Sequence, residues 1–285
     1  MVQNQENNGK YDNRNKLNDL TGKEWLKLTA SYWFSQKCKL DKDALKHPAP
    51  FMVKDIEKLI SLFTKSKMTV LDPFCGSGTT LISAYSTNRY GIGIDLSQDY
   101  YEMAKNRLKA IGANENDKYE YIIGNNLNIV ETLKDSSVDY IVTSPPYFNI
   151  LKNKSEGLRS DKSGKGYRNG ARQGVVSYTN KSVENFENLE TYEIFLSAIK
   201  ELFYRLKRVL RHKKYCSIII SDFTINKKET CVTGDFIRLM QEIGYEFCGN
   251  IALIQENKPL YPFGYPFAYK INHHNQNILN FRNSI

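Results

Sequence analysis

The sequence has little cysteine and no long hydrophobic run. Its five cysteines are odd in number, widely separated and free of any Cys-x-x-Cys pair, so we expect neither a disulfide framework nor a zinc site. No apolar stretch reaches the ~18 residues that cross a bilayer, and the polar start MVQNQENNGKYDNRNK is unlike a secretory signal. The sequence therefore predicts a cytoplasmic protein with no bound metal and no membrane partner.

The composition is that of a globular protein with an excess of positive charge. Of the 285 residues, 41% are hydrophobic and 25% are charged, which excludes a mostly disordered chain. This length allows one large domain or two small ones. The 40 Lys and Arg residues against 31 Asp and Glu residues give a net charge of +9, which favours a polyanionic partner.

Strand-like apolar runs alternate with stretches of helical periodicity. The predicted strands are Met68–Leu71, Tyr90–Ile94, Tyr119–Ile123, Val138–Thr143, Tyr215–Ser221, Tyr245–Gln255 and Asn277–Phe281. The predicted helices are Asp55–Phe63, Thr79–Ser86, Gln98–Ala110, Leu189–Leu210 and Asp235–Ile243. This alternation indicates an α/β fold: a mostly parallel seven-stranded sheet, with helices on both faces and a C-terminal antiparallel hairpin.

Two regions flank or interrupt this pattern. Residues 1–45 are expected to form a loose polar arm followed by an aromatic segment that makes a short helix or a lid on the main domain, residues 46–285. A loop insert at 148–188 has no sustained periodicity, and loops of about 40 residues are usually functional or disordered. Between residues 152 and 181 it carries eight basic side chains against two acidic ones. Either a solvated flexible insert or a nucleic-acid contact fits this composition.

A glycine-rich turn, DPFCGSGTT at residues 72–80, follows the first strand of the alternating part. Such a turn puts backbone N–H groups against a bound ligand, although a tight turn without a ligand uses the same glycines. It lacks the Lys-Ser/Thr of a phosphate loop and the third glycine of the dinucleotide fingerprint. Asp95, 17 residues after Gly78, ends the next strand, where it can bind both hydroxyls of a ribose or cap the helix beginning near Gln98. A nucleoside-containing cofactor is predicted.

The strand Val138–Thr143 runs into Ser144-Pro145-Pro146-Tyr147. Proline has no N–H and holds the preceding residue extended, so this stretch offers fixed hydroxyl and carbonyl acceptors. Acceptors beside an aromatic ring suit a planar group with an NH₂: the acceptors take the amino hydrogens, and Tyr147 stacks on the ring. A purely structural turn is the alternative, but the place at a strand tip facing the cofactor turn favours the functional interpretation.

In this order, the motifs resemble those of the amino-group DNA methyltransferases that use S-adenosylmethionine. DPFCGSGTT resembles their cofactor motif, SPPY their catalytic (Asp/Asn/Ser)-Pro-Pro-(Tyr/Phe) motif, and His47–Phe51 the segment that closes over the methionine part of the cofactor. Residues 259–266 are similar to the C-terminal hairpin of many members. The resemblance covers roughly residues 45–147 and 190–282 and implies a Rossmann-like methyltransferase fold with S-adenosyl-L-methionine as cofactor.

The resemblance also implies a set of site residues and partners. The cofactor-binding residues are Pro50, Phe51, Asp72, Phe74, Gly76, Gly78, Thr79, Asp95 and Asn125; the catalytic residues are Ser144, Pro145, Pro146 and Tyr147. Asn125 stands where the family usually has an acid that meets the adenine amino group of the cofactor. The expected partners are double-stranded DNA and, as a functional pairing, a cognate restriction endonuclease.

DNA contact is expected from basic residues of the insert: Arg159, Lys162, Lys165, Arg168 and Arg172. A flipped base would present its amino nitrogen to the cofactor's methyl group, and Ser at the first SPPY position favours cytosine N4 over adenine N6 within the family. An RNA or protein-amide methyltransferase would share both motifs and remains an alternative, as does a non-catalytic nucleic-acid-binding module. No Pro-Cys dipeptide is present for ring-carbon chemistry, so Cys75 is interpreted as a packing residue.

Overall fold

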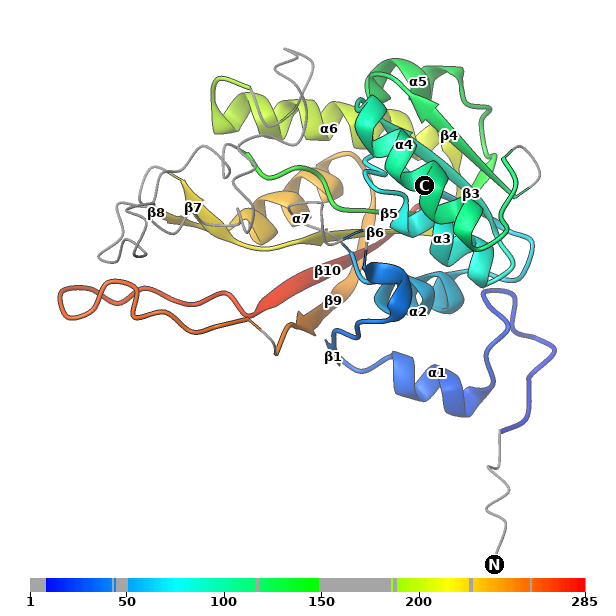
Figure 1. The fold of residues 1–285 in the computed structure, drawn as a ribbon, viewed down its shortest axis with the longest axis horizontal. Helices are drawn as coiled ribbons and strands as arrows, with labels where there is room; N and C mark the ends of the chain where they lie inside the picture. Colours follow the sequence, from blue (N-terminus) through cyan, green and yellow to red (C-terminus); the bar gives the residue numbers. More distant parts are fainter. Residues whose placement is uncertain are drawn as a thin grey trace, which may run out of the picture.

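The computed structural model describes residues 9–42, 44, 51–115, 118–148, 186, 189–225, 228–256 and 258–284. Within these residues, an eight-stranded sheet forms the centre, in the order β1-β9-β10-β6-β5-β2-β3-β4 (Figure 1). Its strands are β1 (Tyr32–Phe34), β2 (Thr69–Asp72), β3 (Tyr90–Asp95), β4 (Tyr119–Ile123), β5 (Val138–Thr143), β6 (Leu210–Ile220), β9 (Glu246–Ile254) and β10 (Asn275–Arg282). Neighbouring strands are parallel except at β10, which runs antiparallel to both β9 and β6.

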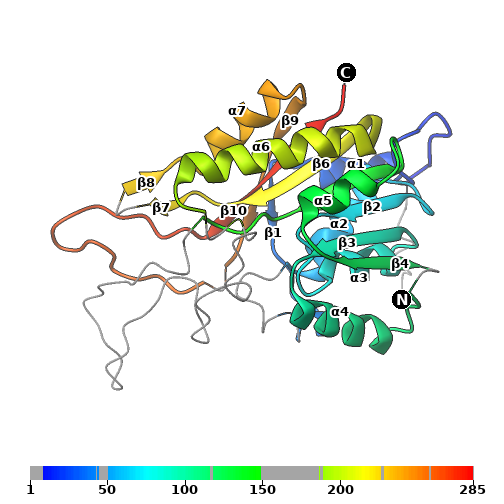
Figure 2. The same cartoon turned by 90° about the horizontal axis from the view of Figure 1, so that it is seen from above.

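Helices cover both faces of the sheet (Figure 2). The helices are α1 (Gly22–Leu28), α2 (Val53–Phe63), α3 (Thr79–Ser86), α4 (Gln98–Ala110), α5 (Asn126–Thr132), α6 (Tyr192–Val209), α7 (Val232–Glu242) and the 3₁₀ turn η1 (Lys39–Asp41). On one face, α5, α6 and α7 share the largest hydrophobic cluster; on the other, α2, α3 and α4 build two smaller ones. None of the described helices is long and apolar enough to span a membrane.

The central strand β5 shows why these residues form a sheet with two covered faces. All six of its residues are buried. Val138 and Ile141 belong to the cluster under α6, while Tyr140 and Val142 pack under α2. A continuous apolar run of this kind is typical of a parallel strand with helices on both sides. The predicted α/β fold, with its mostly parallel sheet and C-terminal antiparallel hairpin, is confirmed.

The sheet has one strand more than the seven predicted. The aromatic segment forms α1 and then β1, which pairs in parallel with β9, with Trp33 opposite Leu253. Trp33 is buried, whereas its neighbours Tyr32 and Phe34 are exposed. A three-residue edge strand is too short for its alternation to be read from the sequence, which is why the sequence predicts only a short helix or a lid here.

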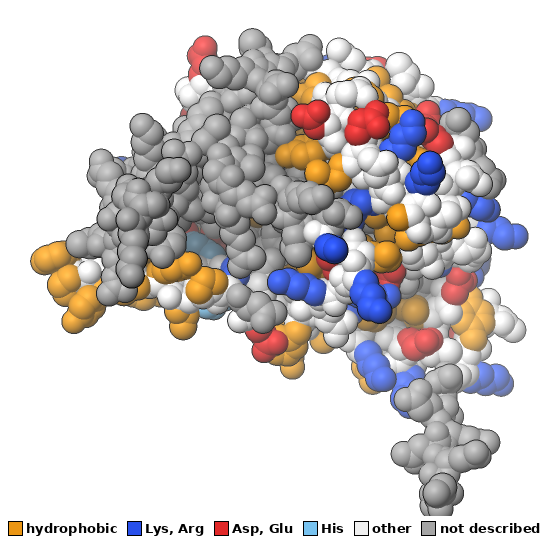
Figure 3. Space-filling model, in the orientation of Figure 1, with side chains coloured by type: hydrophobic (Ala, Val, Ile, Leu, Met, Phe, Trp, Pro, Cys, Tyr) orange, Lys and Arg blue, Asp and Glu red, His pale blue; other side chains and the backbone are white. Residues whose placement is uncertain are grey.

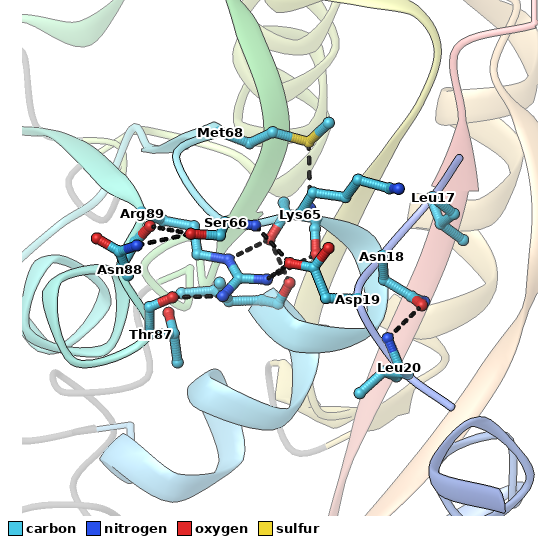
Figure 4. A network of polar contacts seen from close by, with 12 residues as sticks. Leu17, Asn18, Asp19, Leu20, Lys65, Ser66, Met68, Thr87, Asn88 and Arg89 are labelled. Atoms are coloured by element: carbon cyan, nitrogen blue, oxygen red, sulfur yellow. Dashed lines mark hydrogen bonds and ion pairs between the residues drawn. The ribbon is translucent and has the colours of Figure 1, made fainter. Parts of the chain in front are cut away.

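The N-terminal segment also differs from the loose arm expected. Buried Asn18 donates to the Leu62 carbonyl near the end of α2 at 2.6 Å and accepts from the Leu20 backbone N–H at 3.1 Å, as Figure 4 shows for the second bond. Asp19 accepts from the Ser66 backbone N–H at 2.7 Å and lies 3.6 Å from the Arg89 guanidinium. Polar side chains therefore anchor this segment, which is why its lack of apolar residues was misleading.

A small hairpin extends beyond the main sheet. β7 (Phe223–Ile225) and β8 (Lys228–Thr230) pair antiparallel directly after β6. After β9, residues 258–274 form a long projecting loop before the chain returns as β10, as Figures 1 and 2 both show.

Candidate active site

Three strand ends meet at one edge of the sheet. β2 pairs in parallel with both β3 and β5, so the carboxyl ends of all three strands lie at the same edge of the sheet. This edge carries the glycine turn after β2, Asp95 at the end of β3 and the SPPY segment after β5. A side-chain hydrogen bond links the ends of β2 and β5: the Thr143 hydroxyl donates to Asp72 Oδ1 at 2.7 Å. The structure thus brings the glycine turn and Ser144 together.

Asp72 is buried and surrounded by donors. Its carboxylate accepts from the Thr80 hydroxyl at 2.6 Å, the Thr143 hydroxyl at 2.7 Å and the Phe74 backbone N–H at 3.1 Å. Burial raises the pKa of Asp72 to about 6, against the lowering effect of these hydrogen bonds. The carboxylate is therefore directed at the protein itself, and it fixes the glycine turn and the SPPY strand relative to each other. Direct contact of Asp72 with a cofactor stays a prediction.

The two glycines of the turn have backbone conformations that L side chains rarely adopt. Gly76 has φ +48° and Gly78 has φ +78°. A Cβ on Gly78 would also lie 2.6 Å from the Cβ of Ala104 on α4. Both the turn and the close approach of α3 to α4 therefore require glycine at position 78, whether or not a ligand binds.

Two side chains from outside the turn fix its carbonyls and hydroxyls. Tyr121 on β4 donates its hydroxyl to the Gly76 carbonyl at 2.8 Å. Buried Arg107 on α4 donates to the Ser77 hydroxyl at 3.0 Å and to the Thr79 hydroxyl at 3.1 Å. The hydroxyl of Thr79, predicted to bind the cofactor, is thus an acceptor for Arg107.

Asp95 ends β3 and is partly exposed. Its Oδ2 accepts from the Gly76 backbone N–H at 2.8 Å and its Oδ1 from the Ser97 backbone N–H at 3.0 Å. Burial raises the pKa of Asp95, while these backbone hydrogen bonds lower it. The alternative role as the cap of α4 falls instead to Ser97, whose hydroxyl accepts from the Tyr100 N–H at 3.3 Å. Since a carboxylate has about four lone-pair positions, Asp95 retains acceptor capacity for further donors.

Asn125 follows β4 and caps α5. Its side-chain oxygen accepts from the Leu127 backbone N–H at 2.9 Å. The next residue, buried Asn126, donates to the Pro73 carbonyl at 3.2 Å and so holds the start of the glycine turn. One lone pair of the Asn125 oxygen is already used, and its contact with a cofactor adenine stays a prediction.

The two predicted phenylalanines lie in different surroundings. Phe74 is partly buried, with its ring edge-to-face with Phe186 at a centroid distance of 5.3 Å. Phe51 packs against the hydrophobic cluster that contains Trp33. Pro50, also predicted to bind the cofactor, lies outside the described residues.

The SPPY segment leaves the sheet with Pro145 buried and Ser144, Pro146 and Tyr147 partly exposed. Tyr147 is oriented by two contacts: its ring meets Phe223 edge-to-face at 5.4 Å, and its hydroxyl accepts from the Gln276 side-chain amide at 3.3 Å. Gln276 in turn accepts from the Gln255 amide at 3.0 Å. The aromatic ring is thus held in a defined orientation at the edge of the sheet, three residues after Ser144.

Comparison with known proteins identifies this arrangement. Residues 64–244 match the family described as methyltransferase domain, which includes the glycine turn, Asp95 and the SPPY segment. The chain belongs to the methyltransferase-domain family. Residues 2–106 also match the family described as DNA methylase. The resemblance to amino-group DNA methyltransferases is thereby confirmed.

Individual relatives of the chain align over short stretches. It is 38% identical over 100 residues to the type II methyltransferase M2.DpnII of Streptococcus pneumoniae, with 35% of each chain covered. It is 45% identical over 74 residues to the orphan methyltransferase M.BamHII of Bacillus amyloliquefaciens, covering 26% of this chain and 28% of that one. Among solved structures, TrmN from Thermus thermophilus aligns with 86% of this chain and 52% of its own at 14% identity and a TM-score of 0.49. The chain spans about a third or less of the curated relatives it matches.

The cysteine of the turn is a packing residue. Cys75 is buried, and a Cβ on Gly93 would lie 2.4 Å from its sulfur, so Gly93 makes room for it. Burial raises the pKa of the Cys75 thiol well above its ordinary value, so that the nucleophilic thiolate is disfavoured.

Sequence reasoning missed the polar side chains that support the turn and orient Tyr147. Arg107 stands on the apolar face of α4, between Ala104 and Leu108, and an arginine at such a position signals a buried polar contact. Tyr121, Asn126 and Gln276 carry no comparable signal, because their contacts join distant parts of the chain. The predicted DNA-binding residues Arg159, Lys162, Lys165, Arg168 and Arg172 lie outside the described residues.

Proposed function

We propose that this methyltransferase transfers a methyl group from S-adenosylmethionine to the exocyclic amino group of a flipped DNA base, with cytosine N4 as the target atom. One observation carries the proposal: the Thr143–Asp72 hydrogen bond places the SPPY segment directly beside the glycine turn. The residues proposed to bind the cofactor and those proposed to bind the base thus lie at the same edge of the sheet. The match of residues 2–106 to the DNA methylase family, together with the similarity to a type II and an orphan methyltransferase, supports the substrate class.

The hydrogen-bond acceptors at this edge of the sheet fit the cofactor. Asp95 has acceptor capacity beyond its bonds to the Gly76 and Ser97 N–H groups, which suits a ribose diol. Phe74 offers an apolar ring within the glycine turn, and the side-chain oxygen of Asn125, a partly exposed residue, can accept from an adenine amino group. When bound, S-adenosylmethionine supplies a methyl carbon already activated by its sulfonium, so the chain needs no nucleophile of its own.

On the base side, the chain has to make a poor nucleophile reactive. The amino lone pair of cytosine or adenine is delocalised into the ring. Hydrogen bonds from that amino group to the Ser144 hydroxyl and the Pro145 carbonyl would favour a pyramidal nitrogen and stabilise the positive charge that develops on it. The S–C bond would break as the N–C bond forms, and the methylated nitrogen would then lose its surplus proton to solvent. Tyr147, oriented by Gln276 and Phe223, stacks on the ring and holds it in position.

Product analysis tests this proposal. The protein is incubated with mixed-sequence duplex DNA and methyl-labelled cofactor, and the nucleosides are separated and identified. We expect N4-methylcytosine, and no label with the Ser144→Ala/Tyr147→Ala variant. N6-methyladenine as the sole product would overturn the choice of base, while label in total RNA or in protein amides but not in DNA would overturn the substrate class.

DNA binding by the basic insert is part of the proposal. Neutralising Arg159, Lys162, Lys165 and Arg168 should weaken DNA binding and flatten its salt dependence. A variant that contacts fewer phosphates displaces fewer counterions from the DNA when it binds. The affinity for S-adenosylmethionine should not change. An unaltered salt slope would show that the insert does not contact DNA. Pairing with a cognate restriction endonuclease and a cytoplasmic location remain predictions.

A further inference from the structure

The loop between β9 and β10 carries aromatic side chains at every second position. These are Tyr261, Phe263, Tyr265, Phe267 and Tyr269, and the small residues between them are Pro262, Gly264, Pro266 and Ala268. We name residues 258–272 the aromatic arm. It projects away from the sheet in Figure 1, and apolar side chains gather over it in Figure 3.

The rings of the arm are exposed to an unusual degree. Phe267 is 90% exposed, Tyr269 89% and Tyr265 74%. The fold gains nothing from rings in these positions, and contiguous exposed apolar side chains usually mark an interaction site.

The arm has a defined conformation. Asn272 closes its base with two hydrogen bonds to the backbone of Tyr261, each of 2.9 Å. At the tip, the Gly264 carbonyl accepts from the N–H groups of Phe267 at 2.8 Å and of Ala268 at 2.7 Å. Gly264 has φ +76°, and a Cβ there would lie 2.2 Å from the Ala268 carbonyl oxygen, so this turn requires glycine. The rings are therefore presented on an ordered turn, which lowers the entropic cost of binding.

The arm starts at the edge of the sheet that carries the SPPY segment. β9 and β6 both run antiparallel to β10, so the chain after Ile254 leaves the sheet at the same edge as the chain after β5. Gln255, at the root of the arm, donates to Gln276, which donates to the Tyr147 hydroxyl. Two hydrogen bonds thus connect the root of the arm to the ring that is proposed to hold the target base.

The charge of the arm suits a polyanion. Between residues 258 and 272 the chain has two lysines, Lys258 and Lys270, and no acidic residue. Exposed rings flanked by cationic side chains are the combination that stacks on bases while it meets phosphates.

We propose that the aromatic arm is a DNA-binding element whose exposed rings, Phe267 and Tyr269 foremost, stack on bases of the target duplex and stabilise the opening left by the flipped base. The inference rests on the proposed DNA substrate. Stacking on the neighbours of an extruded base would offset part of the cost of unstacking it.

The test compares the Phe267→Ala/Tyr269→Ala variant with Tyr204→Ala, which removes an exposed ring from α6. Tyr204, 62% exposed, lies shortly before β6 begins and so near the opposite edge of the sheet. Each protein is titrated with a duplex that carries the mapped methylation site, and with the same duplex mispaired at the target base.

We expect the arm variant to bind the paired duplex about tenfold more weakly or worse, since stacked aromatic side chains contribute strongly to base binding. The loss should shrink on the mispaired duplex, whose base is already partly unstacked. Cofactor affinity, and all values for Tyr204→Ala, should match the wild type.

Unchanged affinity for the paired duplex, an equal loss on both duplexes or a simultaneous loss of cofactor binding would each overturn the role of the arm. In these three cases the proposed function would stand as long as the wild type methylates DNA. If the wild type methylates RNA or protein and no DNA, the proposed function fails and the role of the arm fails with it.

Discussion

The glycine turn after β2 and the SPPY segment after β5 lie at the same edge of the sheet but are held in different ways. Buried polar side chains support the turn: Asp72 at its start bonds to the Phe74 N–H, and Arg107, Tyr121 and Asn126 from distant elements bond to its hydroxyls and carbonyls. The SPPY segment depends mainly on its own two prolines, with Tyr147 oriented by neighbouring side chains. A change in the turn should therefore affect stability first, and a change in SPPY should affect catalysis first.

The largest effect is expected for Ser144→Ala on the SPPY side. Loss of one acceptor for the reacting amino group should lower kcat by about 10²–10³-fold, that is about 3–4 kcal/mol. The free energy of unfolding should stay within about 0.5 kcal/mol of the wild type, because Ser144 is partly exposed. Single-turnover methylation kinetics and denaturant unfolding measure the two quantities.

Ser137→Ala is the matched control, since Ser137 precedes the opposite end of β5. It should leave kcat unchanged. If Ser144→Ala destabilises the protein strongly, it is wrong that changes in SPPY affect catalysis before they affect stability.

On the turn side, Asp72→Ala should cost about 3 kcal/mol of unfolding free energy, because buried donors lose their acceptor. The donors are Thr80, Thr143 and the Phe74 N–H. Chemical denaturation measures the loss, and Asp99→Ala, at an exposed position in the first turn of α4, is the control. A stability equal to the wild type would refute the supporting role of Asp72.

The pH dependence of stability sharpens the same point. The pKa of Asp72 is raised from 3.8 to about 6, so the folded state holds the proton more tightly than the unfolded state. The stabilisation that this proton provides is complete below pH 3.8 and is lost as the pH rises through about 6. Relative to Asp72→Asn, which does not titrate, the wild type should lose about 2–3 kcal/mol across this range. A flat difference between the two unfolding curves would contradict the raised pKa.

A smaller effect is expected for Tyr121→Phe. The variant loses the hydrogen bond to the Gly76 carbonyl, which should cost about 1 kcal/mol of stability. Cofactor affinity should fall several-fold as the turn loosens, as calorimetric titration can show. Tyr119→Phe, two residues earlier on β4, should change neither quantity.

The smallest effect is expected for Gln276→Ala, which removes the contact that orients Tyr147. We expect kcat to fall several-fold with little change in KM for DNA or in stability, since one neutral hydrogen bond contributes about 1 kcal/mol. Gln276→Glu, which cannot donate to the Tyr147 hydroxyl when ionised, should resemble the alanine variant. Wild-type kcat in both variants would show that Phe223 packing alone orients the ring.

Several elements could not have been predicted from the sequence. The edge strand β1, the helix α5 and the hairpin β7–β8 are each seven residues or fewer per element, too short for a periodic pattern to stand out. Asn125 was interpreted as a cofactor ligand, yet its side chain also caps α5, a role visible only once the helix is known. The capping role considered for Asp95 belongs to Ser97.

By itself, the sequence determined the alternating strands and helices, the position of the glycine turn and the rigid Ser-Pro-Pro-Tyr stretch, because periodicity, glycine and proline act over a few neighbouring residues. Only the tertiary structure decided which side chains support that turn, which donors surround Asp72, and that Gln255 and Gln276 link the aromatic arm to Tyr147. These contacts join residues far apart in the chain. They exist only after the parallel strands have aligned and brought their carboxyl ends to one edge of the sheet.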